Sequence, residues 1–130
     1  MTVRMNSDLL FSSTINDYLG MDHSGAYLNA LVDKFHDAAI DLLHEIDCAI
    51  RENDYAAWRS HLHSLKGVAG IAGARNLHDL CDLLRARNNN TFTDTPDHIM
   101  MELRNAIAHY QSAIQQIPRS SHRLEAKSCR

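Results

Sequence analysis

The chain has 130 residues, 45% of them hydrophobic, and a formal net charge of −3; this length fits one domain with a sizeable core. The acidic balance argues against a nucleic-acid binder, which usually carries a basic stripe. No stretch approaches the roughly 20 apolar residues that cross a bilayer, no signal-peptide pattern is present, and the scattered Cys48, Cys81 and Cys129 indicate a reducing compartment such as the cytosol.

The first part of the chain predicts two helices after a flexible start at residues 1–7. A short amphipathic helix that ends at Gly20 is predicted by its apolar positions: Leu9, Leu10, Ile15, Tyr18 and Leu19. A long helix follows, because apolar residues step by threes and fours at Leu28, Leu31, Phe35, Ala38, Leu42, Ile46 and Ala49. Asn53 and Asp54 interrupt this pattern and supply an N-cap for the next helix.

Three more helices are predicted in the rest of the chain. One carries its apolar face at Trp58, Leu62, Leu65, Ala69 and Ala72 and is expected to close at Gly73. The next has its stripe at Leu77, Leu80, Cys81 and Leu84. After a polar loop at 88–94, Thr95 is expected to be the N-cap and Pro96 the first residue of the last helix. Its stripe comprises Ile99, Leu103, Ile107, Tyr110, Ile114 and Ile117.

These elements predict an all-α fold. No strand pattern and no internal repeat is evident, and each helix has one apolar stripe and a short connection to its neighbour. Such helices pack as an antiparallel four-helix bundle, here over residues 8–117, with the short N-terminal helix capping one end. Residues 118–130 are expected to form a flexible, mildly basic C-terminal tail.

Two glycines, Gly67 and Gly70, lie inside the third predicted helix. A glycine there costs roughly 1 kcal/mol relative to alanine, so the pair needs a reason. At about 100° per residue, His63 lies about 140° from the centre of the apolar face, and the two glycines lie about 180° and 120° away. Lys66 and Arg59 lie about 80° and 100° away on the same flank. His63 is therefore expected to face solvent, between two cations and beside two residues that have no side chain.

These residue types suit phosphoryl transfer. An exposed imidazole has a pKa near 6.5 and offers an uncharged nitrogen nucleophile at neutral pH, while Lys66 can stabilise the oxygens of a transferring phosphoryl group. The chain has neither a GxxxxGK[ST] loop nor a GxGxxG turn after a strand, so nothing in it resembles a nucleotide site. If His63 carries phosphate, both the donor and the acceptor must be other proteins or domains.

The run His63-x-Leu65-Lys66-Gly67-x-Ala69-x-x-x-Gly73-Ala74 resembles the signature of histidine-containing phosphotransfer (HPt) domains of bacterial multistep phosphorelays. The resemblance covers roughly residues 8–117. It implies that His63 accepts phosphate from a receiver-domain aspartate and passes it to another receiver. It implies further that Lys66 stabilises the phosphate, that Gly67 and Gly70 give clearance to the docking receiver, and that Arg59 lies on the near rim. Leu62 is a departure, because the family often has a small residue next to the histidine.

The same resemblance implies a cytoplasmic phosphocarrier, either free or as the C-terminal domain of a membrane-anchored hybrid sensor kinase. Its partners would be response-regulator receiver domains, and any Mg²⁺ would belong to the receiver, so no cofactor is expected on this chain. A kinase core is disfavoured, because 130 all-helical residues leave no room for an ATP-binding domain. The apolar stripes are accounted for by the bundle, and a monomer is expected.

One alternative function stays open from the sequence: a helical docking module that binds a receiver or an enzyme and regulates it without relaying phosphate. Both functions would use the face around His63. They differ in chemistry, because a carrier needs the imidazole nitrogen and a docking module would tolerate His63→Gln.

Other histidines and carboxylates are interpreted as structural. His61 lies about 60° from the apolar centre, where a half-buried position at the core edge is expected. Two triplets have metal-ligand spacing, namely Asp41, His44 and Glu45, and His78, Cys81 and Asp82. No metal site is expected, because metal-binding bundles use inward-facing Glu-x-x-His pairs, which this sequence lacks, and Cys81 fits the core.

Overall fold

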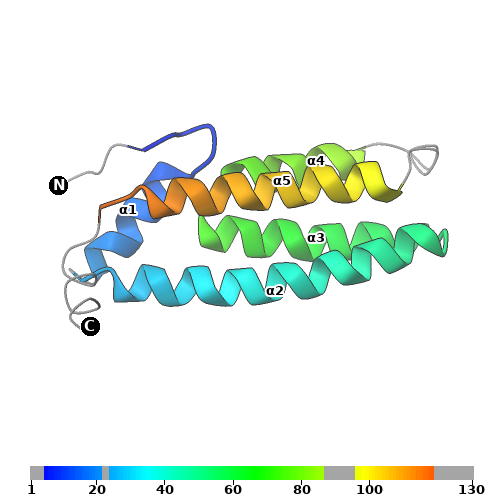
Figure 1. Ribbon diagram of the computed structural model, residues 1–130, viewed down its shortest axis with the longest axis horizontal. Helices are drawn as coiled ribbons and strands as arrows, with labels where there is room; N and C mark the ends of the chain where they lie inside the picture. The colour runs from blue at the N-terminus through cyan, green and yellow to red at the C-terminus, as the bar shows by residue number, and fades with distance from the viewer. Residues whose placement is uncertain (1–4, 22–23, 87–95, 119–130) are drawn as a thin grey trace.

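A computed structural model describes residues 5–21, 24–86 and 96–118. Within these ranges the chain forms five helices, namely α1 (Ser12–Met21), α2 (Ala26–Arg51), α3 (Tyr55–Ala72), α4 (Arg75–Ala86) and α5 (Pro96–Gln115). Helices α2 to α5 run lengthwise beside one another, and α1 crosses one end of the bundle (Figure 1). The predicted all-α fold, a four-helix bundle with a short capping helix, is confirmed.

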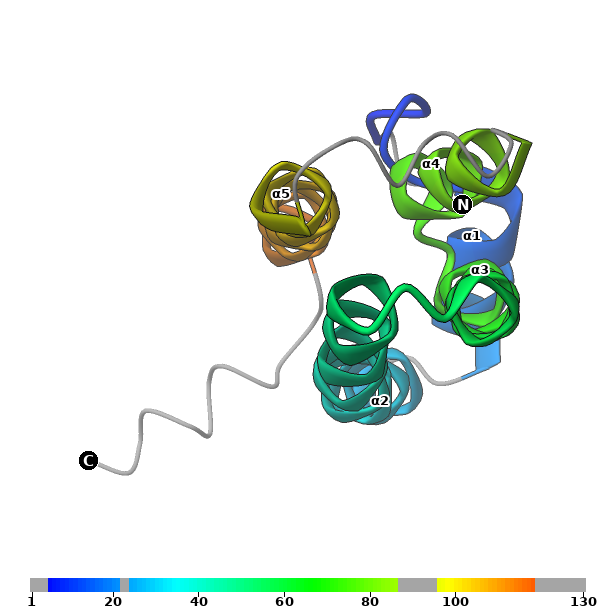
Figure 2. The ribbon, with the colours of Figure 1, turned by 90° about the vertical axis from the view of Figure 1, so that its right-hand side faces the viewer.

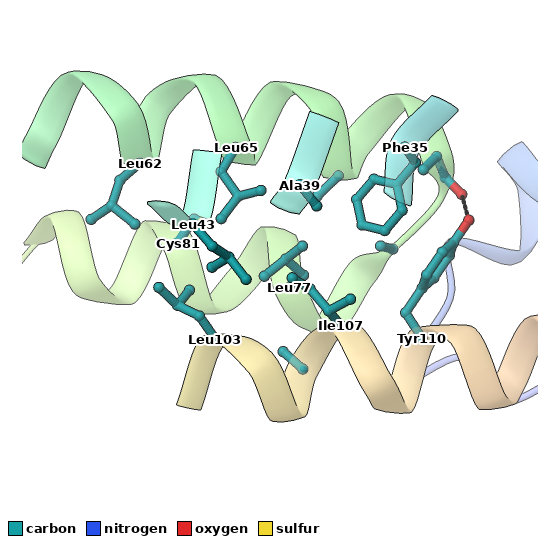
Figure 3. Packing of buried hydrophobic residues seen from close by; sticks show 14 of the residues in the cluster. Phe35, Ala39, Leu43, Leu62, Leu65, Leu77, Cys81, Leu103, Ile107 and Tyr110 are labelled. Carbon is teal, nitrogen blue, oxygen red and sulfur yellow. Dashed lines mark hydrogen bonds between the residues drawn. The ribbon is translucent and has the colours of Figure 1, made fainter. Parts of the chain in front are cut away.

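The apolar stripes of the four long helices meet in one core (Figure 3). All five predicted core positions of α3 are buried, as are those of α5. The core face of α2 is rotated slightly from the prediction, because Ala39 and Leu43 are buried while Ala38 and Leu42 are only partly covered. On α2, Leu31 and Ala38 instead line a hollow at the junction with α3.

Both ends of α3 are formed by the residues that the sequence indicated. The Asp54 carboxylate accepts a hydrogen bond from the Ala57 amide at 3.1 Å and caps the first turn. Gly73 ends the helix in the left-handed region, with φ 76°. A Cβ atom there would lie 2.5 Å from Ile15 Cδ1, so the position requires glycine for space as well as for backbone conformation.

The N-terminal segment corrects one prediction. Leu9 and Leu10 are not helical, since α1 begins at Ser12, and Leu10 forms an isolated antiparallel bridge with Ala74. The Phe11 amide donates to the Gly73 carbonyl at 2.9 Å, and the Arg75 amide donates to the Leu9 carbonyl at 3.0 Å. Backbone groups at the α3–α4 turn have no helical partner, and this extended segment satisfies them.

The helix that follows the second gap begins at Pro96, as predicted. The expected N-cap Thr95, the loop at 88–94, the first four residues and the tail from residue 119 lie outside the described residues. The described helices include none that is both long and apolar enough to cross a membrane.

Candidate functional site

The outer face of α3 carries His63. The helix buries Leu62 and Leu65 in the core, whereas His63 and Gly67, one turn apart, are exposed. This alternation follows from helical geometry, because residues on opposite sides of one helix have opposite environments. Within the described residues, no hydrogen bond or ion pair reaches the His63 ring, so its face of the helix is open to an approaching molecule.

Lys66 is half-buried and does not stand free beside His63. Its Nζ lies 2.6 Å from Asp82 Oδ1, which α4 brings across from the neighbouring helix. The hydrogen bond from Lys66 holds the pKa of the Asp82 carboxyl below its usual value, with smaller contributions from the charges of Lys66, His78 and Arg85 against the opposing effect of desolvation. Asp82 is thus part of the site, although sequence spacing had placed it only in a metal-like triplet.

That triplet is dispersed in the folded chain. Cys81 is fully buried in the core, and burial raises the pKa of its thiol to about 12. Its neighbour Asp82 instead pairs with Lys66, and His78 contacts Asp79 and the ring of Phe11. Throughout the described ranges, no group of three or more His, Cys, Asp or Glu side chains is placed to hold a metal ion.

Arg59 is also directed toward α4. Its guanidinium donates to the backbone carbonyl of Arg85, in the last turn of α4, and lies 5.8 Å from the centre of the Tyr55 ring. Helix C-terminal carbonyls lack intrahelical donors, and a cation is favourable there. In this structure Arg59 therefore caps α4, and its charge is held at the α3–α4 junction.

The two glycines have different surroundings. A Cβ atom added to Gly67 would meet nothing within 4 Å, so the surface beside His63 is low and unobstructed there. A Cβ atom on Gly70 would lie 3.6 Å from His78 Cδ2, an ordinary contact with α4. Gly67 thus borders open space at the surface, whereas Gly70 leaves room beside another helix of the same chain. His61 is half-buried at the edge of the core, as its helix angle predicts.

The other flank of α3 carries an apolar hollow of about 270 Å³. It lies between α2 and α3 and is lined by Leu31, Lys34, Phe35, Ala38, Val68, Ile71 and Ala72. Ile71 is 61% exposed, an unusual setting for a large apolar side chain, and it follows His63 and Gly67 at successive intervals of four residues. In the sequence, the one sign of this position is an isoleucine that lies outside the predicted core stripe.

Two tyrosines from other helices fix the C-terminal end of α3. Tyr18 of α1 donates its hydroxyl to the Ile71 carbonyl at 2.7 Å. Tyr110 of α5 donates to the Ala72 carbonyl at 2.8 Å in the buried interior (Figure 3). These bonds supply partners for carbonyls that the helix end leaves free, and they connect the exposed face of α3 to the rest of the bundle.

Comparisons with known proteins agree with this geometry. A sequence model of the Hpt domain matches residues 30–113, more than half of the chain and including all of α3 and α4. The fold is similar to that of histidine-containing phosphotransfer protein B from Pseudomonas aeruginosa, with a TM-score of 0.67 and 19% identity over 82% of this chain and 91% of that one.

A candidate histidine-containing phosphotransfer protein from rice is similar to the same degree, with a TM-score of 0.67 and 19% identity over 85% of this chain and 82% of that one. The curated protein sequences gave no significant match. The match over residues 30–113 decides the family: the chain belongs to the Hpt domain family.

Proposed function

We propose that this chain is a phosphorelay phosphocarrier in which His63 accepts a phosphoryl group from the aspartyl phosphate of a receiver domain and passes it to another receiver. The observation that carries the proposal is the setting of His63: exposed on α3 of an Hpt domain, beside the open surface at Gly67. An exposed neutral imidazole is a competent nucleophile at neutral pH.

The transfer step exchanges one bond for another. The lone pair of a His63 ring nitrogen attacks phosphorus, the bond between phosphorus and the aspartyl oxygen of the donor breaks, and the carboxylate leaves with that electron pair. The other ring nitrogen keeps its hydrogen. Transfer to the second receiver is the same exchange in reverse, with a carboxylate oxygen as the nucleophile. Because charge on the phosphoryl oxygens must be balanced throughout, a nearby cation favours the step, and Lys66 is the candidate.

The shape of the surface supports a protein partner. Gly67 lets the partner's backbone approach His63, and the hollow with Ile71 offers apolar area next to this face, on the flank of α3 toward α2. Burial of exposed apolar side chains is a common source of binding energy at protein interfaces. We therefore assign the surface to which the receiver docks to the outer side of α3 and its junction with α2. Any Mg²⁺ would be bound by the receiver.

The proposal is tested by incubating the protein with a receiver domain that has been phosphorylated with acetyl phosphate. We expect an acid-labile label on the native protein and none on His63→Gln, whose fold should be unchanged because the side chain is exposed. His61→Gln, two residues away and half-buried, is the matched control and should keep the label.

Full labelling of His63→Gln would contradict the site assignment. If the native protein takes no label from several receivers but still binds them, the docking module is the correct function. Binding by His63→Gln in that experiment would support the same conclusion.

A further inference from the structure

The junction of α3 and α4 carries polar contacts beside the His63 face. Moving along α3 toward its N-terminus, these contacts are Lys66 with Asp82 and Arg59 with the Arg85 carbonyl. Lys66 comes three residues after His63, and residues three apart on a helix are neighbours at about 5–6 Å between Cβ atoms. Lys66 is thus adjacent both to His63 and to Asp82.

The Lys66–Asp82 pair leaves both charged groups accessible. Their side chains are 29% and 48% exposed, and the two atoms are 2.6 Å apart. The hydrogen bond from Lys66 is the largest cause that lowers the pKa of Asp82, and the charges of Lys66, His78 and Arg85 also favour its ionised form, so the carboxylate is charged at neutral pH. In the unphosphorylated protein, the ammonium charge of Lys66 is therefore already balanced.

We propose that Asp82 is a positioning residue for phosphoryl transfer, a counter-ion that holds Lys66 until His63 is phosphorylated and then competes with the phosphoryl group for the ammonium. The inference rests on the proposed function of His63. The exchange makes and breaks no covalent bond and moves no proton, because only the partner of the Lys66 N–H donors changes.

The competition has a direction. A phosphoryl group brings up to about two negative charges next to Lys66. When Lys66 turns to it, the Asp82 carboxylate loses the hydrogen bond and the ion pair that Lys66 supplies. This loss stabilises the unmodified state relative to the phosphorylated one. Asp82 therefore weakens the hold of the protein on the phosphoryl group, which makes onward transfer easier.

The test measures the equilibrium distribution of phosphoryl groups between an acetyl-phosphate-loaded receiver domain and the full chain. We expect Asp82→Asn to shift this equilibrium toward phosphohistidine by about twofold to fivefold, the range of an exposed ion pair. Asp79→Asn is the matched control, because Asp79 also lies on α4 and its partners are Arg75 and His78. It removes the same charge from the same helix and should leave the equilibrium within error of the native protein.

Two further measurements separate positioning from a simple charge effect. In a Lys66→Gln background, Asp82→Asn should no longer shift the equilibrium. In the unphosphorylated protein without a receiver, the NMR chemical shift of the Lys66 ammonium nitrogen should change in Asp82→Asn. It should stay the same in Asp79→Asn.

The outcomes distinguish the two proposals. A native protein that takes no label contradicts the proposed function of His63. A native protein that is labelled, together with an Asp82→Asn equilibrium equal to that of Asp79→Asn, overturns the role of Asp82 alone. A shift that persists in the Lys66→Gln background also overturns it, because Asp82 would then act without Lys66.

Discussion

The two flanks of α3 differ in polarity. The flank toward α4 is polar and its charged side chains are paired: Lys66 with Asp82, and Arg59 with a carbonyl at the end of α4. The flank toward α2 is apolar and open, with Val68 and Ile71 at the edge of a hollow. His63 lies on the outer face between them, and a view along the helices shows α3 flanked by α2 and α4 and diagonal to α5 (Figure 2).

This difference indicates a division of roles on one helix. Charged groups next to the histidine affect the energy of a bound phosphoryl group, whereas an apolar surface affects how tightly a partner binds. If the division is correct, substitutions on the α4 flank change the rate and equilibrium of transfer, and those on the α2 flank change the affinity for the receiver. Gly67 lies between the flanks, and a change there should affect both.

The largest effect is expected at Gly67. Gly67→Leu places a branched side chain on the surface that we propose as the docking face for the receiver. We expect transfer to slow by about a hundredfold, because a small misplacement of reacting groups is enough for such a loss. The rate of phosphoryl transfer from a phosphorylated receiver measures it.

The fold should tolerate changes at Gly67, since an added Cβ atom meets nothing within 4 Å. Gly67→Ala is the matched control: it should keep most of the transfer rate and raise the free energy of unfolding by about 0.5–1 kcal/mol, through the higher helix propensity of alanine. An unchanged rate in Gly67→Leu would show that no partner passes over this surface.

The next largest effect is expected at Lys66, on the α4 flank. Lys66→Gln removes the one positive charge within a helical turn after His63, and we expect the rate constant for transfer to fall by roughly tenfold to a hundredfold, the range for a lost charge-assisted hydrogen bond. Single-turnover kinetics at saturating receiver separate this loss from weaker binding. A rise in the half-saturating receiver concentration with an unchanged rate constant would place Lys66 with the docking residues instead.

A smaller effect is expected at Ile71, on the α2 flank. Ile71→Ser should weaken binding of the receiver by about tenfold, as expected when one exposed apolar contact of about 1.4 kcal/mol is lost. The lifetime of purified phosphohistidine should not change. Ile40→Ser is the matched control, because Ile40 is also an exposed isoleucine, on α2 away from the hollow. Equal losses in the two variants, measured by titration calorimetry, would contradict a specific docking role for the hollow.

The ends of α3 and its exposed face were predictable from the sequence because local signals determine them. Asp54 and Gly73 set the ends of α3 by capping rules that need no tertiary information, and the spacing of Leu62 and Leu65 determines which side faces the core. The exposure of His63 follows directly. The same local signals predicted that α5 begins at Pro96.

The pairing across the α3–α4 junction was not predictable in this way. Helix angles put Lys66 and Arg59 beside His63, and they do not reveal that α4 supplies a partner for each. Which residue of α4 lies opposite Lys66 depends on the turn at Ala74, which is held by the bridge to Leu10. That bridge is a long-range contact, and Leu10 had been predicted to be helical.

The smallest expected effect is on the pH dependence of stability. It tests whether Lys66 and Asp82 form an ion pair in the unphosphorylated protein. The pKa of Asp82 is lowered in the folded chain, chiefly by the hydrogen bond from Lys66. A group whose pKa is lowered on folding stabilises the fold above its unfolded pKa, near 3.9 for aspartate, and loses this contribution as the pH falls through the folded value. Between pH 5 and 8, the melting temperature of the unphosphorylated native protein should therefore be slightly higher than that of Asp82→Asn. The gap should close below about pH 4. A gap that is constant down to pH 3 would mean that the 2.6 Å contact does not depend on the charge of Asp82.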